Sequence, residues 1–360
     1  MMRSLYSGIS GLRNHQTRMD VIGNNIANVN TIGYKGARTV FQDVFSQTAQ
    51  SGSSNQALNF GMGGTNPIQI GLGVRLSTID VLHGPAPMQR TDRALDMMIN
   101  DDGYFVVGMP NPLHPAPFGA VEDIMDDDTI YINEDTGEII PKFTYLYTRA
   151  GDFKMDNDGY LVTSHGYYVL GYNVLPFTFD PEAGDAGEFS DPLTEEEFAD
   201  AMERGDAIFW RSELTHWLYV HKDLEPGEDP EWPRPEPKAI KMADDQVGFA
   251  VDNNGMINII EGNRRRPIAQ LTIGMFANPE GLEKVGNSLY REGNSSGSAN
   301  LTIAGNMGAG TVSGGGLEMS NVDLASEFTD MIVTQRGFQA NSRIITVSDT
   351  MLEELVNLKR

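Results

Sequence analysis

The sequence predicts an α+β multidomain protein, in which terminal N- and C-terminal helices form a coiled-coil domain and the middle of the chain forms discontinuous β-rich domains. Three observations predict this class. Apolar residues follow helical spacing over long stretches only near the two ends of the chain. The middle contains short runs of Val, Ile, Tyr and Phe next to Asx-Gly pairs. A length of 360 residues leaves room for two or three cores, at roughly 150 residues per domain.

The first helix is expected within residues 1–35. Its apolar residues step along the chain by threes, fours and one seven, so they share one face of a helix. Gly8, Gly11 and Gly23 each cost about 1 kcal/mol relative to alanine, so we expect this helix to fold only with a partner, on assembly. The apolar stripe, interpreted as a self-assembly face, consists of Leu5, Ile9, Leu12, Met19, Ile22 and Ile26.

The second helix is expected within residues 320–360. Ser320 or Asn321 is predicted to cap its first amides, and Asp323 lies in the first turn, where a negative charge is favourable. Lys359 and Arg360 complement the negative end of the helix dipole. Its stripe, also interpreted as a self-assembly face, consists of Leu324, Phe328, Met331, Phe338, Ile345, Leu352 and Leu355.

Two such stripes predict that the ends of the chain meet. The pattern alone leaves two interpretations open. The helices could form a hairpin packed on one globular core, or they could form a pair whose apolar faces pack on other subunits.

A stretch rich in asparagine, residues 27–35, follows the first helix. Its Asn side chains can bond nearby backbone and Gly33 permits a positive φ, so it predicts a turn that ends the helix. Together with residues 320–324 and 335–341, it closely resembles the two terminal signatures of the axial proteins of the bacterial flagellum, the rod and hook family. The first signature is carried by Asn28, Asn30, Thr31, Gly33 and Tyr34.

Within that family the chain most resembles the hook proteins. Four stretches carry this likeness: residues 63–67, 69–74, 276–282 and 355–358. The resemblance implies a structural subunit of the flagellar hook with no catalysis and no cofactor, which assembles into a curved tube and transmits torque from rod to filament. It also implies that the terminal helices form an inner tube around the export channel.

The resemblance further implies partners and a location. The chain is expected to bind copies of itself in a helical homopolymer, the distal rod protein, the hook cap, the hook–filament junction proteins and the flagellar type III export apparatus. It is expected to be extracellular, in the flagellum, and exported without a cleavable signal peptide, because its first residues lack a continuous apolar core.

Two alternatives stay open. A distal rod protein would share both terminal signatures, although rod proteins as a rule lack so large an outer insertion. A carbohydrate-active or adhesive surface protein would belong to another class and would need an aromatic-lined carboxylate cleft near Trp210, Trp217 and Trp232.

The middle of the chain is expected to form β-hairpins at Asp102-Gly103, Asp158-Gly159 and Asn254-Gly255. The third hairpin follows a segment that matches nothing known to us, which suggests a domain that is split in sequence. Residues 47–64 are expected to be a flexible joint within a longer linker at 36–75. The predicted parts are a terminal domain at 1–35 and 320–360, a linker at 36–75, a β-rich domain at 76–172 and 247–319 with an acidic insertion at 109–141, and an inserted outer domain at 173–246.

Charge and composition exclude several functions. Residues 91–263 hold 10 basic and 37 acidic side chains, whereas residues 1–90 hold 7 and 3 and residues 264–360 hold 9 and 10. So acidic a centre argues against nucleic-acid binding, which needs a basic footprint. The chain has no cysteine, which excludes disulfides and thiolate chemistry. It has no run of 18 apolar residues, so no membrane insertion is expected.

Motifs with possible chemistry are better explained as structure. Residues 293–297 match G-x-S-x-G, but no histidine follows them, as the nucleophile elbow would require. Residues 156–159 resemble the start of a calcium loop, yet Lys154 stands where a ligand is needed, so a hairpin turn is expected. His216 and His221 lack the spacing of a zinc helix. No metal or catalytic residue is therefore predicted.

Overall fold

The computed structural model describes most of the chain, and it separates into two compact units. The helical unit comprises Met1–Asn30, Lys35–His83 and Ser320–Arg360, and the β unit comprises Thr31–Tyr34 and Gly84–Met319. Among the described residues, no helix combines the length and apolar character that a membrane crossing requires. The described residues are 2–52, 65–110, 143–180, 188–189, 208–212, 235–242, 248–261 and 264–358.

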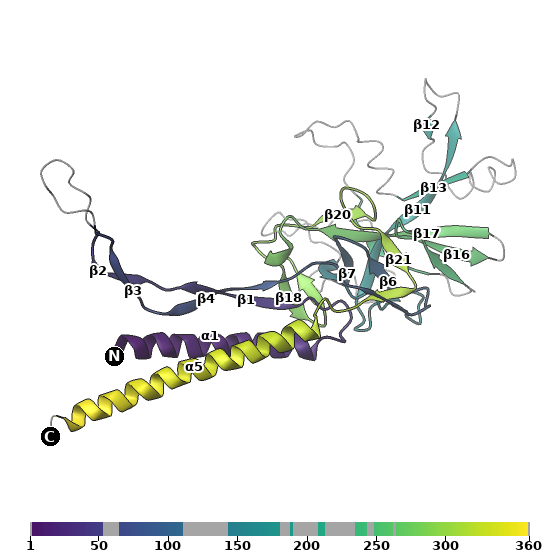
Figure 1. The fold of residues 1–360 in the computed structure, drawn as a ribbon. Coiled ribbons are helices and arrows are strands. Elements are labelled where there is room, and N and C mark those ends of the chain that lie inside the picture. Colours follow the sequence, from purple (N-terminus) through teal and green to yellow (C-terminus); the bar gives the residue numbers. More distant parts are fainter. Residues whose placement is uncertain are drawn as a thin grey trace, which may run out of the picture. The chain divides into compact units, whose positions relative to one another are not determined.

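The helical unit contains the two terminal helices, as predicted. Helix α1 (Met2–Ala27) and helix α5 (Leu324–Asn357) lie side by side and run antiparallel (Figure 1). Two strand pairs complete the unit: β1 (Ala37–Asp43) with β4 (Val74–Val81), and β2 (Ser46–Gln50) with β3 (Ile68–Gly71). These pairs form an antiparallel ribbon that packs on α1, where the rings of His15 and Phe41 meet edge to face with 6.2 Å between centroids.

The ribbon occupies most of the stretch expected to be a linker. Residues 37–43, 46–50, 68–71 and 74–75 lie in paired strands, whereas residues 53–64 lie outside the described part of the chain. A flexible joint was predicted because residues 47–64 are rich in Ser, Gly, Asn and Gln, whereas the β-formers within 37–43 and 74–81 favour strands. Direct cross-strand partners such as Phe41 and Leu76 stabilise this pairing because their side chains lie on one face.

The predicted cap of α5 was wrong. Asp323 is the N-cap: its backbone is extended, and its carboxylate accepts a hydrogen bond of 3.0 Å from the Ala325 amide. Ser320 instead accepts a bond from the Val322 amide, before the helix begins. Asn321 is committed to the ribbon, because its Oδ1 accepts from the Gly36 amide at 2.8 Å and its Nδ2 donates to the Leu82 carbonyl at 2.7 Å.

The β unit is built on one antiparallel sheet with fourteen strands among the described residues. Its main path runs β15 (Phe249–Val251), β16 (Met256–Glu261), β17 (Arg264–Met275), β11 (Tyr168–Asp180), β7 (Tyr104–Pro110), β8 (Phe143–Thr148), β19 (Leu289–Arg291) and β18 (Glu283–Gly286). Further strands pair with this path: β9 (Lys154–Met155), β10 (Leu161–Val162), β12 (Glu188–Phe189), β13 (Ile208–Ser212), β14 (Lys238–Ala239) and β20 (Asn300–Ile303).

Two small strand pairs and a short 3₁₀ helix complete the β unit. Strand β6 (Met97–Ile99) pairs with β21 (Val312–Gly314), and β5 (Met88–Arg90) pairs with β22 (Gly316–Glu318). The 3₁₀ helix, η1, spans Pro279–Gly281. Strands from distant parts of the sequence are neighbours in the sheet, since β17 pairs with both β11 and β7.

Two of the three predicted hairpins are confirmed. Strands β9 and β10 pair across Asp158-Gly159, and β15 and β16 pair across Asn254-Gly255. The hairpin predicted at Asp102-Gly103 is wrong, because β6 pairs with β21 and β7 enters the large sheet. Gly103 has a φ of 127°, and a Cβ atom there would lie 2.5 Å from Ile273, so the glycine serves a sharp bend at a crowded position.

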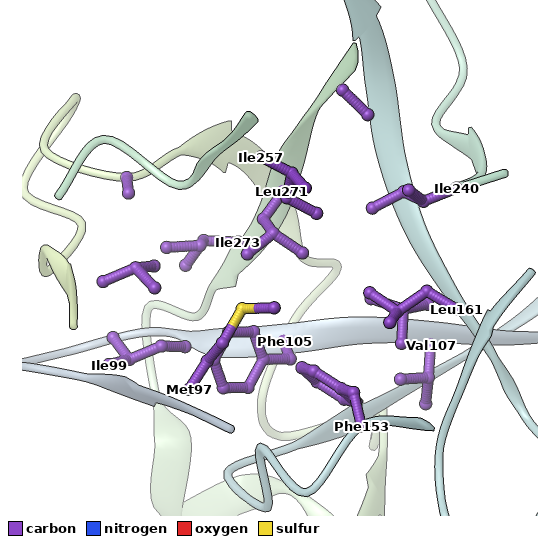
Figure 2. Close-up of a cluster of buried hydrophobic side chains, with 14 of the residues drawn as sticks. Met97, Ile99, Phe105, Val107, Phe153, Leu161, Ile240, Ile257, Leu271 and Ile273 are labelled. Atoms are coloured by element: carbon purple, nitrogen blue, oxygen red, sulfur yellow. The ribbon is translucent and has the colours of Figure 1, made fainter. Parts of the chain in front are cut away.

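The core of the β unit brings together side chains from both halves of the sequence. Phe105 and Phe153 meet edge to face, with 5.1 Å between ring centroids. Around them lie fully or nearly fully buried residues (Figure 2): Met97, Ile99, Val107, Leu161, Ile240, Ile257, Leu271 and Ile273. Because residues before 162 pack directly on residues after 239, neither stretch could bury its apolar surface alone.

Most of the segment expected to be an outer domain, 173–246, lies outside the described residues, as do His216, His221, Trp217 and Trp232. In the described part, β11 continues as one strand across residues 172 and 173, and β13 pairs with it. The acidic insertion at 109–141 is described only at its first two residues, which end β7.

A buried ion pair ties the two small strand pairs to the large sheet. An Arg149 guanidinium nitrogen lies 3.5 Å from a carboxylate oxygen of Glu318, and the two side chains are 2% and 0% exposed. The guanidinium also donates to the carbonyls of Ile99 and Asp101, at 3.3 and 2.8 Å. The other Glu318 oxygen accepts from the Ala86 amide. Each charge is therefore held by several partners.

This ion pair predicts a large loss of stability in a single variant. Arg149→Met would leave the Glu318 carboxylate buried without its counter-charge, which should lower the free energy of unfolding by about 3–5 kcal/mol. Urea denaturation followed by β-sheet circular dichroism measures it. The control is Arg291→Met, which breaks the exposed pair with Glu283 and should cost about 1 kcal/mol or less. Equal losses in the two variants would contradict the prediction.

Candidate assembly interface

Helices α1 and α5 meet through small and polar side chains, along a contact that we call the seam. Seven residues of α1 recur at alternating spacings of four and three and so fall on one face of the helix. They are Ser4, Gly8, Gly11, His15, Arg18, Ile22 and Asn25. Six of the seven are small or polar.

Glycines set the distance between the helices in the seam. A Cβ atom on Gly11 would lie 2.6 Å from Nδ2 of Asn341, and one on Gly337 would lie 2.7 Å from the His15 ring. A Cβ atom on Gly8 would also be crowded, at 3.3 Å from an Ile345 carbon. These glycines weaken the isolated helices, but they allow the backbones to approach closely.

Polar pairs run along the rest of the seam. The hydroxyl oxygens of Ser4 and Ser348 are 3.5 Å apart, near the start of α1 and the end of α5. Arg18 and Asp330 form an ion pair, with 3.0 Å between nitrogen and oxygen. Such pairs fix the antiparallel register of the two helices, while each exposed ion pair contributes only about 0–1 kcal/mol.

Asn25 connects both helices to the ribbon. Its Nδ2 donates to the Ala37 carbonyl at 2.8 Å and to a Glu327 carboxylate oxygen at 2.9 Å, and its Oδ1 accepts from the Ala37 amide at 3.0 Å. The residue is buried, at 2% exposed. Replacing it would leave several polar groups without partners at this junction.

Most of the predicted apolar stripes lie outside the seam. On α1, Ile22 is buried and Ile9 is exposed, while the half-buried members are Leu5, Leu12, Met19 and Ile26. On α5, the half-buried members are Met331, Ile345 and Leu352, and the exposed members are Leu324, Phe328, Phe338 and Leu355. Further exposed apolar residues of α5 are Ile332, Val333, Ile344, Val347, Met351 and Val356. The chain itself therefore leaves an extensive apolar surface on α5 uncovered.

Of the seven seam residues of α1, only Ile22 belongs to the predicted stripe, because the prediction was based on apolar periodicity. It treated Gly8 and Gly11 as costs to the helix and Asn25 as a turn former. The available signal was the same heptad spacing carried by small residues, which mark close approach between helices.

The signature after α1 divides between the two units. Asn28 ends the helix by donating to the carbonyl and side-chain oxygens of Asn24, and Asn30 is exposed. Gly33 has a φ of 65°, as expected, and its amide donates to the Glu318 carbonyl at 2.9 Å. A Cβ atom there would lie 2.6 Å from the backbone of Ala150.

The remaining signature residues also make structural contacts within the β unit. Thr31 and Tyr34 lie on either side of Ile32 and Gly33, and the Ile32 carbonyl accepts a bond from the Ser288 hydroxyl at 3.3 Å. The Tyr34 ring faces the Lys284 ammonium, 4.9 Å from the ring centre. Thr31–Tyr34 thus anchors a short stretch of chain in the β unit.

Burial lowers the pKa of His15, and the nearby Arg18 lowers it further. The imidazole lies in the seam beside Gly337 and Phe41, and its Nδ1 has no hydrogen-bond partner among the described residues. The folded helix pair therefore favours the neutral imidazole.

The motifs considered for chemistry take structural roles. Residues 156–159 form the turn between β9 and β10, where the Gly159 amide bonds to the Asp156 carbonyl at 3.1 Å. In the loop at 293–297, the Ser296 hydroxyl bonds to the Gly293 carbonyl at 2.9 Å.

Three family models match the chain. "Flagella basal body rod protein" matches residues 5–35, "Flagellar hook protein FlgE/F/G D1 domain" matches residues 140–259, and "Flagellar basal body rod FlgEFG protein C-terminal" matches residues 313–358. The first and third matches coincide with the two helices and their flanking signatures.

Whole-length relatives agree with these matches. The flagellar basal-body rod protein FlgG of Bacillus subtilis is 39% identical over 100% of both chains. The flagellar hook protein FlgE of Borreliella burgdorferi is 31% identical over 100% of both chains. The solved structure of the Helicobacter pylori flagellar hook protein FlgE2 covers 64% of this chain and 100% of its own, at 13% identity and a TM-score of 0.32.

The close approach at Gly11 predicts that a larger side chain will separate the helices. Gly11→Leu should overpack the seam and cost about 1–3 kcal/mol, which lowers the melting temperature of the helical circular dichroism signal. Gly23→Leu is the matched control, because a Cβ atom there meets nothing within 4 Å. It should raise helix stability by up to about 1 kcal/mol. If both variants melt at the same temperature, the close approach does not limit the seam.

The position of His15 predicts a loss of helix-pair stability on acidification. The unfolded chain binds a proton near the ordinary pKa of 6.5, whereas the folded chain binds it only at lower pH. Stability is therefore full above about pH 7.5 and falls as the pH decreases through 6.5. Helical melting at about pH 8 and pH 5.5 measures the change, and His15→Gln should remove much of it.

A second group, Glu327, changes stability with pH in the opposite direction. Burial raises the pKa of Glu327, so protonation of its carboxylate stabilises the fold and acts against the His15 effect at more acidic pH. If the melting temperature of the His15→Gln variant changed with pH as much as that of the wild type, His15 would not be the source of the effect.

Proposed function

Because the chain belongs to the family of flagellar rod and hook proteins, we propose that it is a structural subunit of the flagellar hook that self-assembles into a curved tube. In this proposal the terminal helices form a coiled-coil inner tube, and the β-rich parts form the outer layers. The subunit transmits torque from rod to filament.

One observation carries the proposal: the apolar surface of α5 is left exposed by the chain that bears it. Phe328 and Ile332 are 51% and 58% exposed, although α1 lies alongside the same helix. Each large apolar side chain that is taken out of water stabilises a contact by about 1.5–3 kcal/mol. A helix with this much exposed apolar surface is suited to an assembled state.

The remaining parts of the proposal rest on the family. The proposed partners are further copies of the chain, the distal rod protein, the hook cap, the hook–filament junction proteins and the type III export apparatus. The proposed location is extracellular, in the flagellum, after export without a cleavable signal peptide.

The distal rod is the second candidate, and a specific observation favours it. The relative named as a rod protein is more similar, at 39% identity, than the relative named as a hook protein, at 31%. The length of the chain also favours the rod, because the rod relative aligns with it end to end over 362 residues, whereas the alignment with the hook relative extends over 465. The four hook-like stretches favour the hook.

Electron microscopy of the concentrated, purified protein in negative stain tests the proposal. Curved tubes would support the hook and straight tubes the rod. Absence of any polymer, at a concentration and salt where the protein is folded, would overturn self-assembly.

A charge placed on the stripe of α5 is predicted to block assembly. Phe338→Asp or Leu352→Asp would bring a carboxylate into an apolar contact between subunits, at a cost of several kcal/mol. Sedimentation should detect no polymer, while β-sheet circular dichroism should stay unchanged. Gln339→Asp is the control, because it adds the same charge at the neighbouring exposed position. Polymer yields equal to wild type would place Phe338 and Leu352 outside the contact.

A further inference from the structure

The hairpin of β16 and β17 begins its second strand with a run of three arginines, residues 264–266. The two strands lie side by side in Figure 1. Residues 264–267 pair with β16 alone among the described strands, because β11, β20 and β7 join β17 only from residue 269 onward. Arg265 and Arg266 are both exposed, and as neighbours in a strand they point to opposite faces. This end of the hairpin, which we call the tip, is therefore open to other molecules.

The arginines of the tip differ from those in the rest of the β unit. Neither Arg265 nor Arg266 forms an ion pair with a described residue. A guanidinium suits a carboxylate because its planar fork donates two parallel hydrogen bonds. All other arginines of the β unit whose side chains the structure describes have such a partner: Arg90 pairs with Asp92, Arg93 with Asp96, Arg149 with Glu318 and Arg291 with Glu283.

A pocket of about 330 Å³ lies elsewhere in the β unit. Asp152, Thr163, Ser164, His165 and Asn287 contribute polar groups to its lining, and no arginine or lysine is among the described residues that line it. The Ser164 hydroxyl donates to a carboxylate oxygen of Asp152, but that carboxylate has no counter-charge among the described residues. The pocket therefore offers a carboxylate and further oxygen acceptors to a cation.

The tip cannot reach the pocket of its own chain. Thr148 lines the pocket and pairs with Phe105, which in turn pairs with Ile273 of β17. Ile273 is eight residues from Arg265 on the same strand, which places the tip about 26 Å along β17 from the level of the pocket. An arginine that enters the pocket must come from another molecule.

Charge favours a second copy of this chain as that molecule. Residues 91–263 hold 37 acidic and 10 basic side chains, so two copies carry a large excess of like charge and repel each other. Contact between them is favourable where an unpaired cation of one copy meets a carboxylate of the other. The tip and the pocket supply these two charges.

We propose that the tip of one subunit docks at the pocket of the next, where a guanidinium of Arg265 or Arg266 pairs with the Asp152 carboxylate. This inference rests on the proposed self-assembly and adds a contact between the β-rich parts of neighbouring subunits. The tip and the pocket are different surfaces, so the contact is heterologous and can repeat from subunit to subunit.

The critical concentration for assembly, measured by sedimentation, tests this pair of charges. Asp152→Asn removes the negative charge but keeps an oxygen that can accept from Ser164, and Arg265→Gln/Arg266→Gln removes both positive charges. Each variant should raise the critical concentration about tenfold, because a charged hydrogen bond is lost. The triple variant should be no worse than either, since the interaction is already absent. Unchanged values, or effects that add in the triple variant, would overturn the inference.

The matched control is Arg90→Gln. It removes an exposed arginine charge of the β unit whose partner, Asp92, belongs to the same chain, so the critical concentration should not change. A rise equal to that of the tip variants would mean that net charge sets the critical concentration, and would overturn the inference.

Cross-linking identifies the partner directly. Arg265→Lys/Arg266→Lys keeps both charges and supplies amines, which a carbodiimide joins to a carboxylate in contact with them. An equal mixture of unlabelled and heavy-isotope-labelled subunits is assembled, cross-linked and mapped by mass spectrometry. The introduced amines should link to Asp152, and about half of these links should join a light to a heavy chain. The control Arg291→Lys should link to Glu283 within one chain only.

The other outcomes separate this inference from the proposed self-assembly. If polymer forms but the introduced amines link within one chain, link to other carboxylates such as those of residues 122–138, or do not link at all, the docking is wrong and self-assembly stands. If no polymer forms although circular dichroism shows folded protein, both proposals fall.

Discussion

The close contact between α1 and α5 is the constraint on which the helical unit depends. Its backbones approach each other because glycines stand at Gly8, Gly11 and Gly337, where any Cβ atom would be crowded. A seam made of small and polar residues has little room for large side chains. The large apolar residues of α5 are therefore displaced to its flanks, where they are available to other molecules. The glycines of the seam thus weaken the isolated helices. They also leave the contact within the chain separate from the apolar surface of α5 that is proposed for assembly.

Sequence patterns predicted the main parts of the fold but few of their contacts. Helical periodicity identified both terminal helices, and Asx-Gly pairs identified two hairpins, because these signals are local. The wrong predictions concerned contacts between distant parts of the chain, or side chains for which two structural roles compete. Asn321 is a good capping residue, but the ribbon competes for its side chain, and Asp323 takes the cap. The partner of β6 lies more than 200 residues away, so no local pattern could indicate it. The apolar stripes were found, while the seam, which is polar, was not.

The signature after α1 shows how one short motif serves two units. The chain belongs to the helical unit up to Asn30, to the β unit over Thr31–Tyr34, and to the helical unit again from Lys35. Gly33 supplies the positive φ and the space that its contact with Ala150 requires, and its amide bonds to Glu318. Glu318 is also half of the buried ion pair with Arg149. A motif that resembles a family signature is in this chain a structural anchor.

The displaced apolar surface of α5 also has a consequence in mass action. Any ligand that binds only the folded state raises apparent stability in proportion to the logarithm of its free concentration, and here the proposed ligand is the protein itself. Folding of the terminal helices and growth of the polymer would then be coupled, so that each favours the other. Dilute subunits would carry marginal helices, whereas subunits above a critical concentration would stabilise one another. If subunits associate as proposed, the terminal helices would be most stable where the local concentration of subunits is highest, at the growing end of a polymer.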